Sequence, residues 1–499
     1  MSLKDEAPMG TAGKASSIYP CWMWIATAIV VAIACCDLIE PIANLPFRVP
    51  RSFNEGWNAY WAVIAVSGGH LYPPMGATVS NNYPPASFFL VGLLGEVMGD
   101  PILAGRTVAL ASFLTVTIVI VMWLRRNGVR NSLAILTGAA FIITLDALSH
   151  GLIGTDDPQW LAHALITAGM LILWRNPRST PRVAGSAALM ILGLWVKHLL
   201  IPMPAAITIW MSHVNRRALW TWIVSAVVLG ALFLSATLAG YGREFVDGVL
   251  RAPRRLLVAR SILMAYDVLP ALLPILCLSA VSIRNVRTSE AARFALLYLA
   301  LAAIVAAIAC AGDGVAENAY FDVAIAGSLA AGLALEDTAS RVAARSRQHF
   351  LLKAAVLAPA LILIAWTPLA IHYNVDRLRA LSVRRQATPG DIEFMRQHGA
   401  RYAACESLSL CFWSGAPFNF DFFNFGQKLK TGAIPVNVCA SLFNGTRYTV
   451  IQLYAPPKNV DDRLPSQCNR VIADHYEVAR SSINGAFLLP REKSLSTSK

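Results

Sequence analysis

Long apolar runs recur along the first three quarters of the chain, with short polar segments between them. The first extends from Tyr19 to about Leu38, and further runs follow at 104–124, 131–149, 158–174, 184–200, 201–213, 218–239, 265–283, 291–310, 318–336 and 351–371. A helix of about 20 apolar residues crosses the hydrocarbon core of a bilayer. The pattern predicts an α-helical polytopic membrane protein with about eleven transmembrane helices. A further short helix is expected at 84–97, dipping into the membrane.

The pattern changes near His372, where polar and apolar residues begin to mix. Short β-like runs at Tyr448–Tyr454 and Ala486–Leu489 alternate with a helical pattern near Asp391–His398. Turn signals occur at Pro389-Gly390, Ser414-Gly415, Asn444-Gly445 and Asn484-Gly485. We therefore expect a transmembrane domain at 1–371, with a first external loop at 41–103, and a small α/β domain at 372–499.

Composition agrees with a membrane protein, since 56% of the residues are hydrophobic, 14% are charged and the mean hydropathy is +0.53. The net charge of +13 comes largely from basic residues in alternate polar segments, which is the positive-inside pattern and not that of a nucleic-acid-binding protein. These residues are Arg125, Arg126 and Arg130; Arg175, Arg178 and Arg182; Arg216 and Arg217; Arg284, Arg287 and Arg293; Arg341, Arg345, Arg347 and Lys353.

If these basic clusters face the cytoplasm, the side of the membrane on which each polar segment lies follows. The N-terminus is then cytoplasmic, and the first apolar run is a retained anchor because no small-residue cleavage site follows it. The segments 41–103, 150–157, 240–264 and 311–317 and the C-terminal domain are extracytoplasmic. Four cysteines of that domain, Cys405, Cys411, Cys439 and Cys468, then suit two disulfides of undetermined connectivity. The spacing of Cys and His residues matches no zinc site.

One external segment is rich in basic residues, although basic residues elsewhere concentrate in the cytoplasmic segments. Between Arg243 and Arg260 it contains Arg251, Arg254 and Arg255 among apolar residues. The pattern predicts a basic amphipathic helix on the outer leaflet, which would attract anionic head groups or a lipid phosphate. The alternative is a solvated or lipid-paired face without a catalytic role.

The first external loop holds the most unusual stretch, from Asn54 to Pro85. Asn54 is a plausible N-cap of a helix in which Trp57, Tyr60 and Trp61 share one face, as in an aromatic belt at the membrane interface. Glu55 and Asn58 share another face. An acid at the mouth of an apolar bundle needs a partner or a function, so Glu55 is a candidate catalytic residue.

A second acidic feature is Asp156-Asp157, which lies between two apolar runs and directly before Pro158. Two adjacent carboxylates can bind a cation, orient a sugar hydroxyl or assist a base. The alternative is that one of them caps the helix that begins at Pro158, which leaves the other free to face a cavity.

Cationic and polar residues also lie near the outer ends of the apolar runs. Lys197, His198 and Arg106 either extend to the membrane surface or meet a phosphate in a cavity. Glu317, Asn318 and Tyr320 are expected at the outer surface. Asp322 is expected slightly within the membrane, where a structural hydrogen bond is the alternative to a functional role.

Taken in order, these motifs resemble the GT-C superfamily of membrane glycosyltransferases, lipid-phosphate-sugar-dependent enzymes that include aminoarabinose and mannosyl transferases. The resemblance rests on Asn54-Glu55, on Tyr83-Pro84-Pro85 leading to Gly105-Arg106, on Asp156-Asp157-Pro158, on Lys197 and on the exported C-terminal domain. The resemblance extends over nearly the whole chain. Within the family, the chain is similar to bacterial members. Many relatives have an Asp-Glu pair where this chain has Asn54-Glu55.

The resemblance implies transfer of a hexosyl or pentosyl group from a polyprenyl-phosphate donor to a lipid or glycan acceptor, on the outer face of a bacterial inner membrane. Glu55 is the expected general base, with Asp156 and Asp157 assisting. The expected lipid-phosphate and substrate ligands are Asn58, Tyr83, Arg106, Lys197, His198, Arg254, Arg255, Glu317, Asn318 and Tyr320. A single displacement would invert the anomeric centre. No cofactor is required, although a divalent cation is compatible with the acids.

Two other functions fit parts of the pattern. A lipid or saccharide transporter or flippase would place its polar sites near the bilayer midplane, often on broken helices or repeats, whereas the candidate residues here gather at the outer ends of the runs. A non-catalytic envelope assembly protein would depend on residues 372–499 and not on Glu55.

Overall fold

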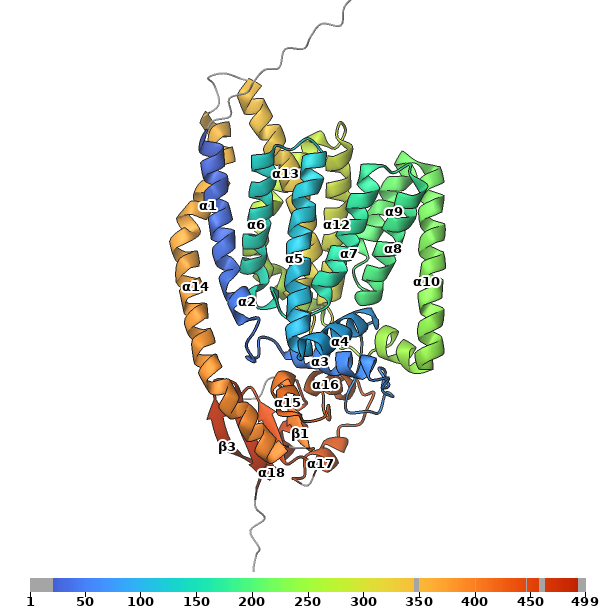
Figure 1. Ribbon diagram of the computed structural model, residues 1–499, viewed down its shortest axis with the longest axis vertical. Helices are drawn as coiled ribbons and strands as arrows, with labels where there is room; N and C mark the ends of the chain where they lie inside the picture. The colour runs from blue at the N-terminus through green and yellow to red at the C-terminus, as the bar shows by residue number, and fades with distance from the viewer. Residues whose placement is uncertain (1–20, 345–349, 400, 446, 457–462, 492–499) are drawn as a thin grey trace, which may run out of the picture.

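The computed structural model describes residues 21–344, 350–399, 401–445, 447–456 and 463–491. A bundle of long helices stands above a smaller domain formed by the C-terminal part of the chain (Figure 1). The bundle helices are α1 (Cys21–Asp37), α2 (Ile39–Asn44), α5 (Pro101–Arg126), α6 (Asn131–Ser149), α7 (Gln159–Arg175), α8 (Thr180–Val196), α9 (Pro202–Val214), α10 (Arg216–Phe245), α11 (Val258–Val281), α12 (Glu290–Cys310), α13 (Phe321–Ala344) and α14 (Phe350–Gly399). The helical membrane architecture expected from the sequence is confirmed.

Each predicted apolar run coincides with one of these helices, and local signals set their ends. Asp100 accepts a hydrogen bond from the Ile102 amide (2.9 Å) and caps α5, which begins at Pro101 and ends with Arg125 and Arg126. Within the described residues, seven helical segments are both long and apolar enough to cross a membrane. The total of about eleven transmembrane helices stays a prediction.

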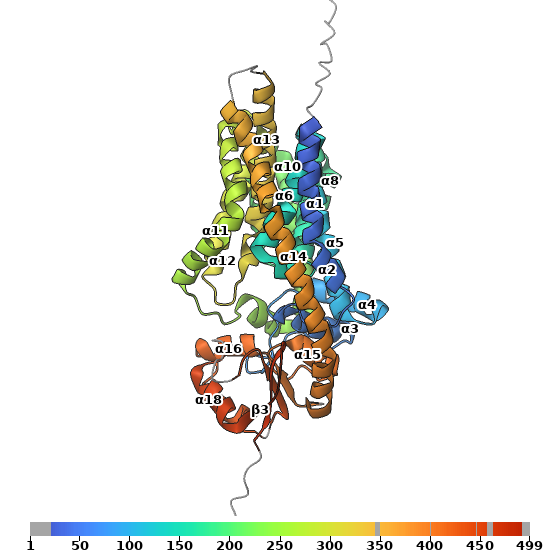
Figure 2. The ribbon, with the colours of Figure 1, turned by 90° about the vertical axis from the view of Figure 1, so that its left-hand side faces the viewer.

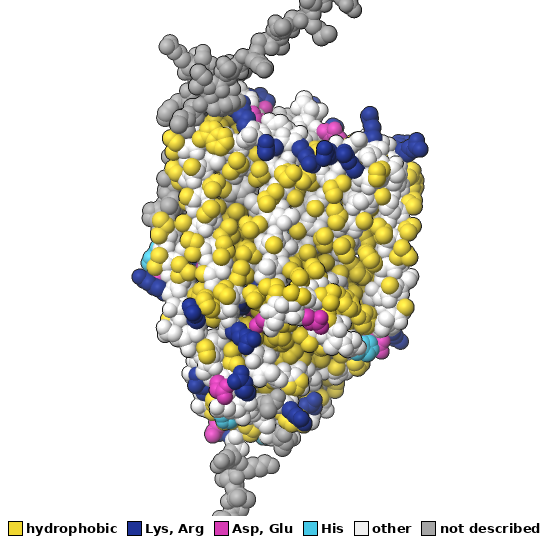
Figure 3. Space-filling model, in the orientation of Figure 1, with side chains coloured by type: hydrophobic (Ala, Val, Ile, Leu, Met, Phe, Trp, Pro, Cys, Tyr) yellow, Lys and Arg dark blue, Asp and Glu magenta, His cyan; other side chains and the backbone are white. Residues whose placement is uncertain are grey.

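The surface of the bundle carries a broad belt of hydrophobic side chains (Figure 3). Lysine and arginine side chains gather at the end of the bundle that lies opposite the C-terminal domain. This distribution is the one expected for a bundle that spans a bilayer with its basic end in the cytoplasm.

Helices α3 (Phe53–Val66) and α4 (Ala86–Met98) lie between the bundle and the domain (Figure 1). The cap of α3 is Ser52, whose side chain accepts from the Asn54 amide at 3.2 Å, so the assignment of Asn54 as the cap was wrong by two residues. A short helix was expected near α4 and is present.

The aromatic face of α3 is covered by protein and does not lie in a membrane-interface belt, which corrects the sequence interpretation. Trp57, Tyr60 and Trp61 are all buried. The Tyr60 ring stacks on Phe418 at 4.8 Å, and its hydroxyl donates to the Ala416 carbonyl (2.6 Å). These residues anchor the C-terminal domain to the first external loop.

The segment between α10 and α11 is not the single amphipathic helix that was expected at 243–260. Gly242 has a φ of 61° and kinks the end of α10, and a π-helical turn follows at Val246–Leu250. Beyond Pro253 the backbone pairs with the α12–α13 loop, because the Leu257 amide donates to the Ala311 carbonyl (2.7 Å). The pairing with a distant loop replaces helical hydrogen bonds here.

Helix α14 connects the bundle to the domain and runs along the outside of the bundle beside α1 (Figure 2). Its 50 residues pass through the boundary expected at 371–372 without a break. Pro389-Gly390 lies inside this helix, so the turn predicted there is wrong. The β-hairpin of the domain packs on this stretch, where Asp391 accepts from Arg480 Nε (2.8 Å).

The domain is a four-stranded sheet with strand order β1-β2-β4-β3, flanked by helices. β1 (Ala403–Cys405) runs parallel to β2 (Val450–Leu453), and β4 (Gly485–Pro490) pairs antiparallel with both β2 and β3 (Tyr476–Ser482). The helices are α15 (Leu408–Ser414), α16 (Phe422–Lys430), α17 (Val438–Leu442) and α18 (Ser466–His475). The predicted α/β domain is confirmed, and it contains disulfides Cys405–Cys411 and Cys439–Cys468.

Candidate functional site

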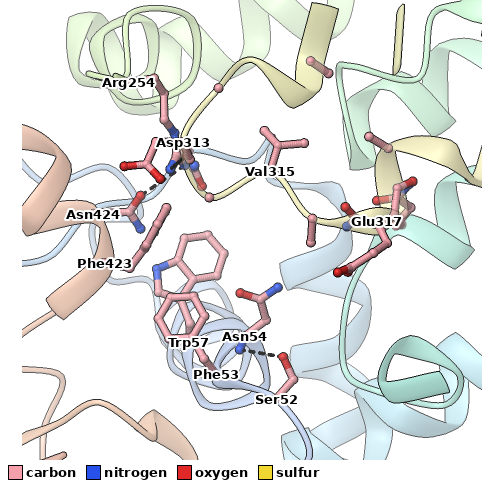
Figure 4. A pocket seen from close by; sticks show the side chains of 18 of the residues that line it. Ser52, Phe53, Asn54, Trp57, Arg254, Asp313, Val315, Glu317, Phe423 and Asn424 are labelled. Atoms are coloured by element: carbon pink, nitrogen blue, oxygen red, sulfur yellow. Dashed lines mark hydrogen bonds between the residues drawn. The ribbon is translucent and has the colours of Figure 1, made fainter. Parts of the chain in front are cut away.

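A cavity of about 1610 Å³ lies where the bundle meets the C-terminal domain. Its walls come from the start of α3, the α8–α9 junction, the α10–α11 and α12–α13 loops, and helices α16 and α18. In Figure 4, Arg254, Asp313, Phe423 and Asn424 lie together on one side and Glu317 lies on the other, with Trp57 and Asn54 between them. Six separate parts of the chain therefore meet around one space.

Glu55 lies behind this wall and does not line the cavity. It is 0% exposed, and its carboxylate accepts from Arg106 Nε (2.6 Å) and Nη2 (2.7 Å) and from the Arg51 amide (3.0 Å). Arg106 donates its remaining hydrogen bonds to carbonyls of the first external loop, among them Phe47 (2.8 Å) and Val49 (2.7 Å). The pair thus holds the loop on α5, and neither partner presents a free group to a substrate.

Asp156 occupies a small separate pocket with Asn58 and Gly105. A Cβ atom on Gly105 would lie 1.9 Å from the Asp156 carboxylate, so only glycine allows this approach. Burial raises the pKa of Asp156 well above its usual range, and Glu55 and Asp157 raise it further. Asn58 Nδ2 donates to the Asp156 carbonyl at 2.7 Å. Both residues are close to Glu55 but do not line the main cavity.

Asp157 connects the second acidic motif to the cavity wall. One oxygen accepts from the Gln159 amide at the start of α7 (2.9 Å), so the expected capping role holds for this residue. The other oxygen accepts from Asn54 Nδ2 at 3.2 Å. Lys197 Nζ lies 3.5 Å from the first oxygen. Asp157 therefore orients Asn54 and compensates the charge of Lys197 from behind the wall.

Lys197 lines the cavity although it is largely buried. It donates to Gln159 Oε1 (2.7 Å), and its ammonium lies 5.0 Å from the centre of the Tyr83 ring. A cation held in this way cannot extend to the membrane surface, which excludes that alternative. His198 and Tyr83 also line the cavity, so these three predicted ligands are brought together.

Three arginines of the α10–α11 segment form the basic wall of the cavity: Arg254, Arg255 and Arg260. Within the described residues, none of them lies within 4.0 Å of a carboxylate oxygen. Arg254 donates to Asn424 Oδ1 (3.3 Å) and stacks on Phe423 at 4.8 Å. Burial lowers the pKa of Arg254, but a guanidinium stays charged at physiological pH. These three side chains therefore give this wall of the cavity a positive charge.

The α12–α13 loop closes the same side of the cavity through Asp313. This carboxylate accepts from Gln427 Nε2 (2.9 Å) and pairs with Lys430 (3.7 Å), both on α16. Burial opposes ionisation of Asp313, but these two partners and Arg260 hold its pKa below the usual range. The loop is thereby fastened to the C-terminal domain.

Some of the remaining predicted residues line the cavity, and another lies inside the helical bundle. Glu317, Asn318 and Asp322 line the cavity, and in the described part of the chain Glu317 makes no hydrogen bond or ion pair through its carboxylate. Tyr320 lines instead an apolar pocket between α11, α12 and α13. Asp322 accepts a short hydrogen bond from the Tyr298 hydroxyl, which is the structural role considered for it.

Several cavity residues were missed by the sequence analysis, chiefly Phe53, Phe423, Tyr454 and Arg463. Three of them belong to the C-terminal domain, and their positions carry no motif. Only Phe53 had a signal in the sequence, because it lies directly before the Asn54-Glu55 motif. Within the described residues, no group of three His, Cys, Asp or Glu side chains could hold a metal ion.

Three solved structures share this architecture. ArnT from Cupriavidus metallidurans bound to undecaprenyl phosphate has a TM-score of 0.57 at 12% identity, covering 96% of this chain and 99% of that chain. Apo ArnT from the same organism has a TM-score of 0.62 at 12% identity, covering 94% and 97%. The oligosaccharyltransferase of Archaeoglobus fulgidus, tethered by a disulfide to an acceptor peptide containing the NVT sequon, has a TM-score of 0.53 at 11% identity, covering 95% and 75%.

No protein-family model and no curated protein matches the sequence. The resemblance to GT-C glycosyltransferases is thus confirmed for the fold, over nearly the whole chain. At this level of identity the likeness shows the fold alone.

Proposed function

We propose that this protein is an integral-membrane glycosyltransferase that moves a sugar from a polyprenyl-phosphate donor to an acceptor on the extracytoplasmic face of the membrane. The fold supports this proposal, because the related ArnT structure contains undecaprenyl phosphate. The observation that carries it is the basic wall formed by Arg254, Arg255 and Arg260, which lines a large cavity and has no described carboxylate oxygen within 4.0 Å of its guanidinium groups.

The basic wall suits the phosphate of a lipid donor. Leu256, Leu257 and Ile308 line the cavity beside the arginines, so apolar and cationic groups are adjacent, as a prenyl phosphate requires. Lys197 supplies a further cation from the α8–α9 junction. Guanidinium groups bind phosphate oxygens through charge-assisted hydrogen bonds, which strengthen as charge develops on a departing phosphate.

The proposed reaction is a single displacement. The oxygen of an acceptor hydroxyl attacks the anomeric carbon, the bond from that carbon to the phosphate oxygen breaks, and the lipid phosphate leaves with the electron pair. A carboxylate takes the hydroxyl proton. One such step inverts the anomeric centre and needs no metal.

The carboxylate that takes the proton must line the cavity and be free of other partners. Asp313, Glu317 and Asp322 all line it, but Asp313 is held by Gln427 and Lys430 and Asp322 by Tyr298. Glu317 lines the cavity, whereas the oxygens of Glu55 are occupied by Arg106 and Arg51 and those of Asp157 by Asn54 and Gln159. We therefore assign the base to Glu317 and positioning roles to Glu55 and Asp157.

The test uses the full-length protein in lipid nanodiscs. Binding of radiolabelled undecaprenyl phosphate is measured first, followed by sugar release and transfer from a panel of undecaprenyl-phosphate sugars. Arg254→Gln and Arg255→Gln should each weaken lipid-phosphate binding by about tenfold. Glu317→Gln should lower the transfer rate by roughly 10²–10⁴-fold while leaving that binding intact.

Arg251→Gln is the matched control, because Arg251 belongs to the same segment but does not line the cavity. It should bind the lipid as the wild type does. Absence of both lipid-phosphate binding and turnover in the wild type, across the whole panel, would refute the proposed function.

A further inference from the structure

A continuous series of aromatic and guanidinium groups runs along one wall of the cavity. Arg463 lies 5.2 Å from the Tyr454 ring and 4.9 Å from the Phe53 ring. The Phe53 and Phe423 rings are 5.8 Å apart, and Arg254 lies 4.8 Å from Phe423. All five line the cavity, and we call this series the stacking wall.

The stacking wall joins two chemically different regions. One end is the basic wall at Arg254. The other end is Tyr454 in the C-terminal domain, where Arg463 forms an ion pair with Glu406 at 3.1 Å. This pairing compensates the charge of Arg463, so the domain end presents flat faces and little net charge.

The side chains around the Tyr454 end are small and polar. Ser407, Ser466, Gln467 and Asn484 all line the cavity, and the exposed Ser466 and Gln467 offer a hydroxyl and an amide group to it. Tyr454 is 42% exposed as a residue, although the β2 residues directly before it are buried. A partly exposed aromatic side chain that lines a cavity together with neutral hydrogen-bonding groups is typical of a ligand-binding surface.

We propose that the stacking wall is the acceptor site and that the acceptor is a saccharide of more than one ring. A pyranose ring presents an apolar C–H face that packs on aromatic rings, while its hydroxyls bond to amide and hydroxyl side chains. The series is longer than one sugar ring, so it suits an oligosaccharide. The assignment of this saccharide as the acceptor rests on the proposed glycosyltransferase function.

The position of the stacking wall fits delivery of a hydroxyl to the reacting centre. Phe53 is followed directly by Asn54, which lines the cavity between the basic wall and Glu317 (Figure 4). A saccharide lying on Tyr454 and Phe53 would place its end beside these residues. The Tyr454 end belongs to the C-terminal domain, which lies below the helical bundle (Figure 1), and this favours a water-exposed glycan over a lipid tail.

The test measures saccharide binding by the full-length protein in nanodiscs. An array of neutral di-, tri- and tetrasaccharides identifies a binder, whose Kd is then measured for variants. Tyr454→Leu keeps an apolar side chain but removes the ring, and it should weaken binding by about tenfold. Tyr454→Phe keeps the ring and should bind within about threefold of the wild type. Undecaprenyl phosphate binding should be the same in all of them.

Tyr402→Leu is the control, since Tyr402 is an exposed tyrosine of the same domain that does not line the cavity. The proposal is overturned if no saccharide binds, if Tyr454→Leu binds as well as the wild type, or if only peptides on a parallel array bind through Tyr454. Saccharide binding that depends on Tyr454, without any undecaprenyl-phosphate binding or sugar transfer, would support the stacking wall and contradict the proposed function.

Discussion

The buried pair of Glu55 and Arg106 is held by contacts within the protein, which is why Glu55 is assigned a positioning role in the proposed function. Both side chains are almost fully enclosed, and every oxygen of Glu55 has a donor. Removing one charge leaves the other uncompensated in a medium of low polarity. Glu55→Gln should therefore lower the free energy of unfolding by about 3–5 kcal/mol.

The measurement is thermal and chemical unfolding of the purified variant in detergent. Glu96→Gln is the control, because Glu96 is an exposed acid of the same external loop. A Glu55→Gln protein with wild-type stability and no transfer activity would contradict the positioning role and restore Glu55 as the base.

The sequence motifs indicated which polar residues lie close together, but they did not indicate which carboxylate is exposed to the cavity. Glu55, Asn58, Asp156 and Asp157 do gather at one place, as their motifs predicted. Which carboxylate faces the cavity depends on Arg106 from α5 and on the domain that covers α3. Neither contact leaves a pattern in the local sequence.

Among the helices, α16 holds two loops of the cavity wall in place. It binds the α12–α13 loop through Gln427 and Lys430, and the first external loop through Lys428, whose ammonium donates to the Ala77 carbonyl at 2.8 Å. The amphipathic pattern of a nine-residue helix gives no sign of these partners, because they lie more than one hundred residues away in the chain. Contacts between residues so far apart in the chain could not be predicted from one sequence.

Lys428 makes the attachment of α16 dependent on pH. Burial lowers its pKa to about 8, whereas an unfolded lysine titrates near 10.4. Between about pH 8 and pH 10 the unfolded chain holds a proton that the folded chain has released, so the free energy of unfolding rises with pH in this window. The gain is on the order of 2 kcal/mol and is absent below pH 8, where both states are protonated.

The measurement compares the melting temperatures of the wild type and Lys428→Met at about pH 7.5 and pH 9.5. Titrations shared by the two proteins cancel in the difference. The wild type should gain stability relative to the variant at the higher pH. An unchanged difference would mean that Lys428 keeps an ordinary pKa and that its ammonium is not buried.

For the whole molecule, periodicity and charge were sufficient to predict the architecture. Apolar runs predicted the bundle helices and turn signals indicated the α/β domain, because both depend on local sequence. The continuous α14 and the broken segment after α10 departed from prediction, since packing against Asp391 and pairing with the α12–α13 loop override the local signals there. The cavity itself exists only where these parts meet.

The distribution of charge predicts the orientation of the whole molecule in the membrane. The basic end of the bundle lies opposite the domain (Figures 1 and 3), so one end should face the cytoplasm and the other the extracytoplasmic space. In a background lacking the bundle cysteines, Ser466→Cys in the domain should react with a membrane-impermeant maleimide in right-side-out vesicles. Thr288→Cys, in the basic loop after α11, should react only in inverted vesicles.

Sidedness also decides whether the chemistry is feasible. Cys405, Cys411, Cys439 and Cys468 pair stably only in an oxidising compartment, and they belong to the same domain as the Tyr454 end of the stacking wall. Mass mapping of non-reduced protein from the membrane should therefore find the two disulfides together with labelling of Ser466→Cys from outside. The reverse labelling, with four free thiols, would place the cavity in the cytoplasm, where an extracytoplasmic acceptor could not reach it.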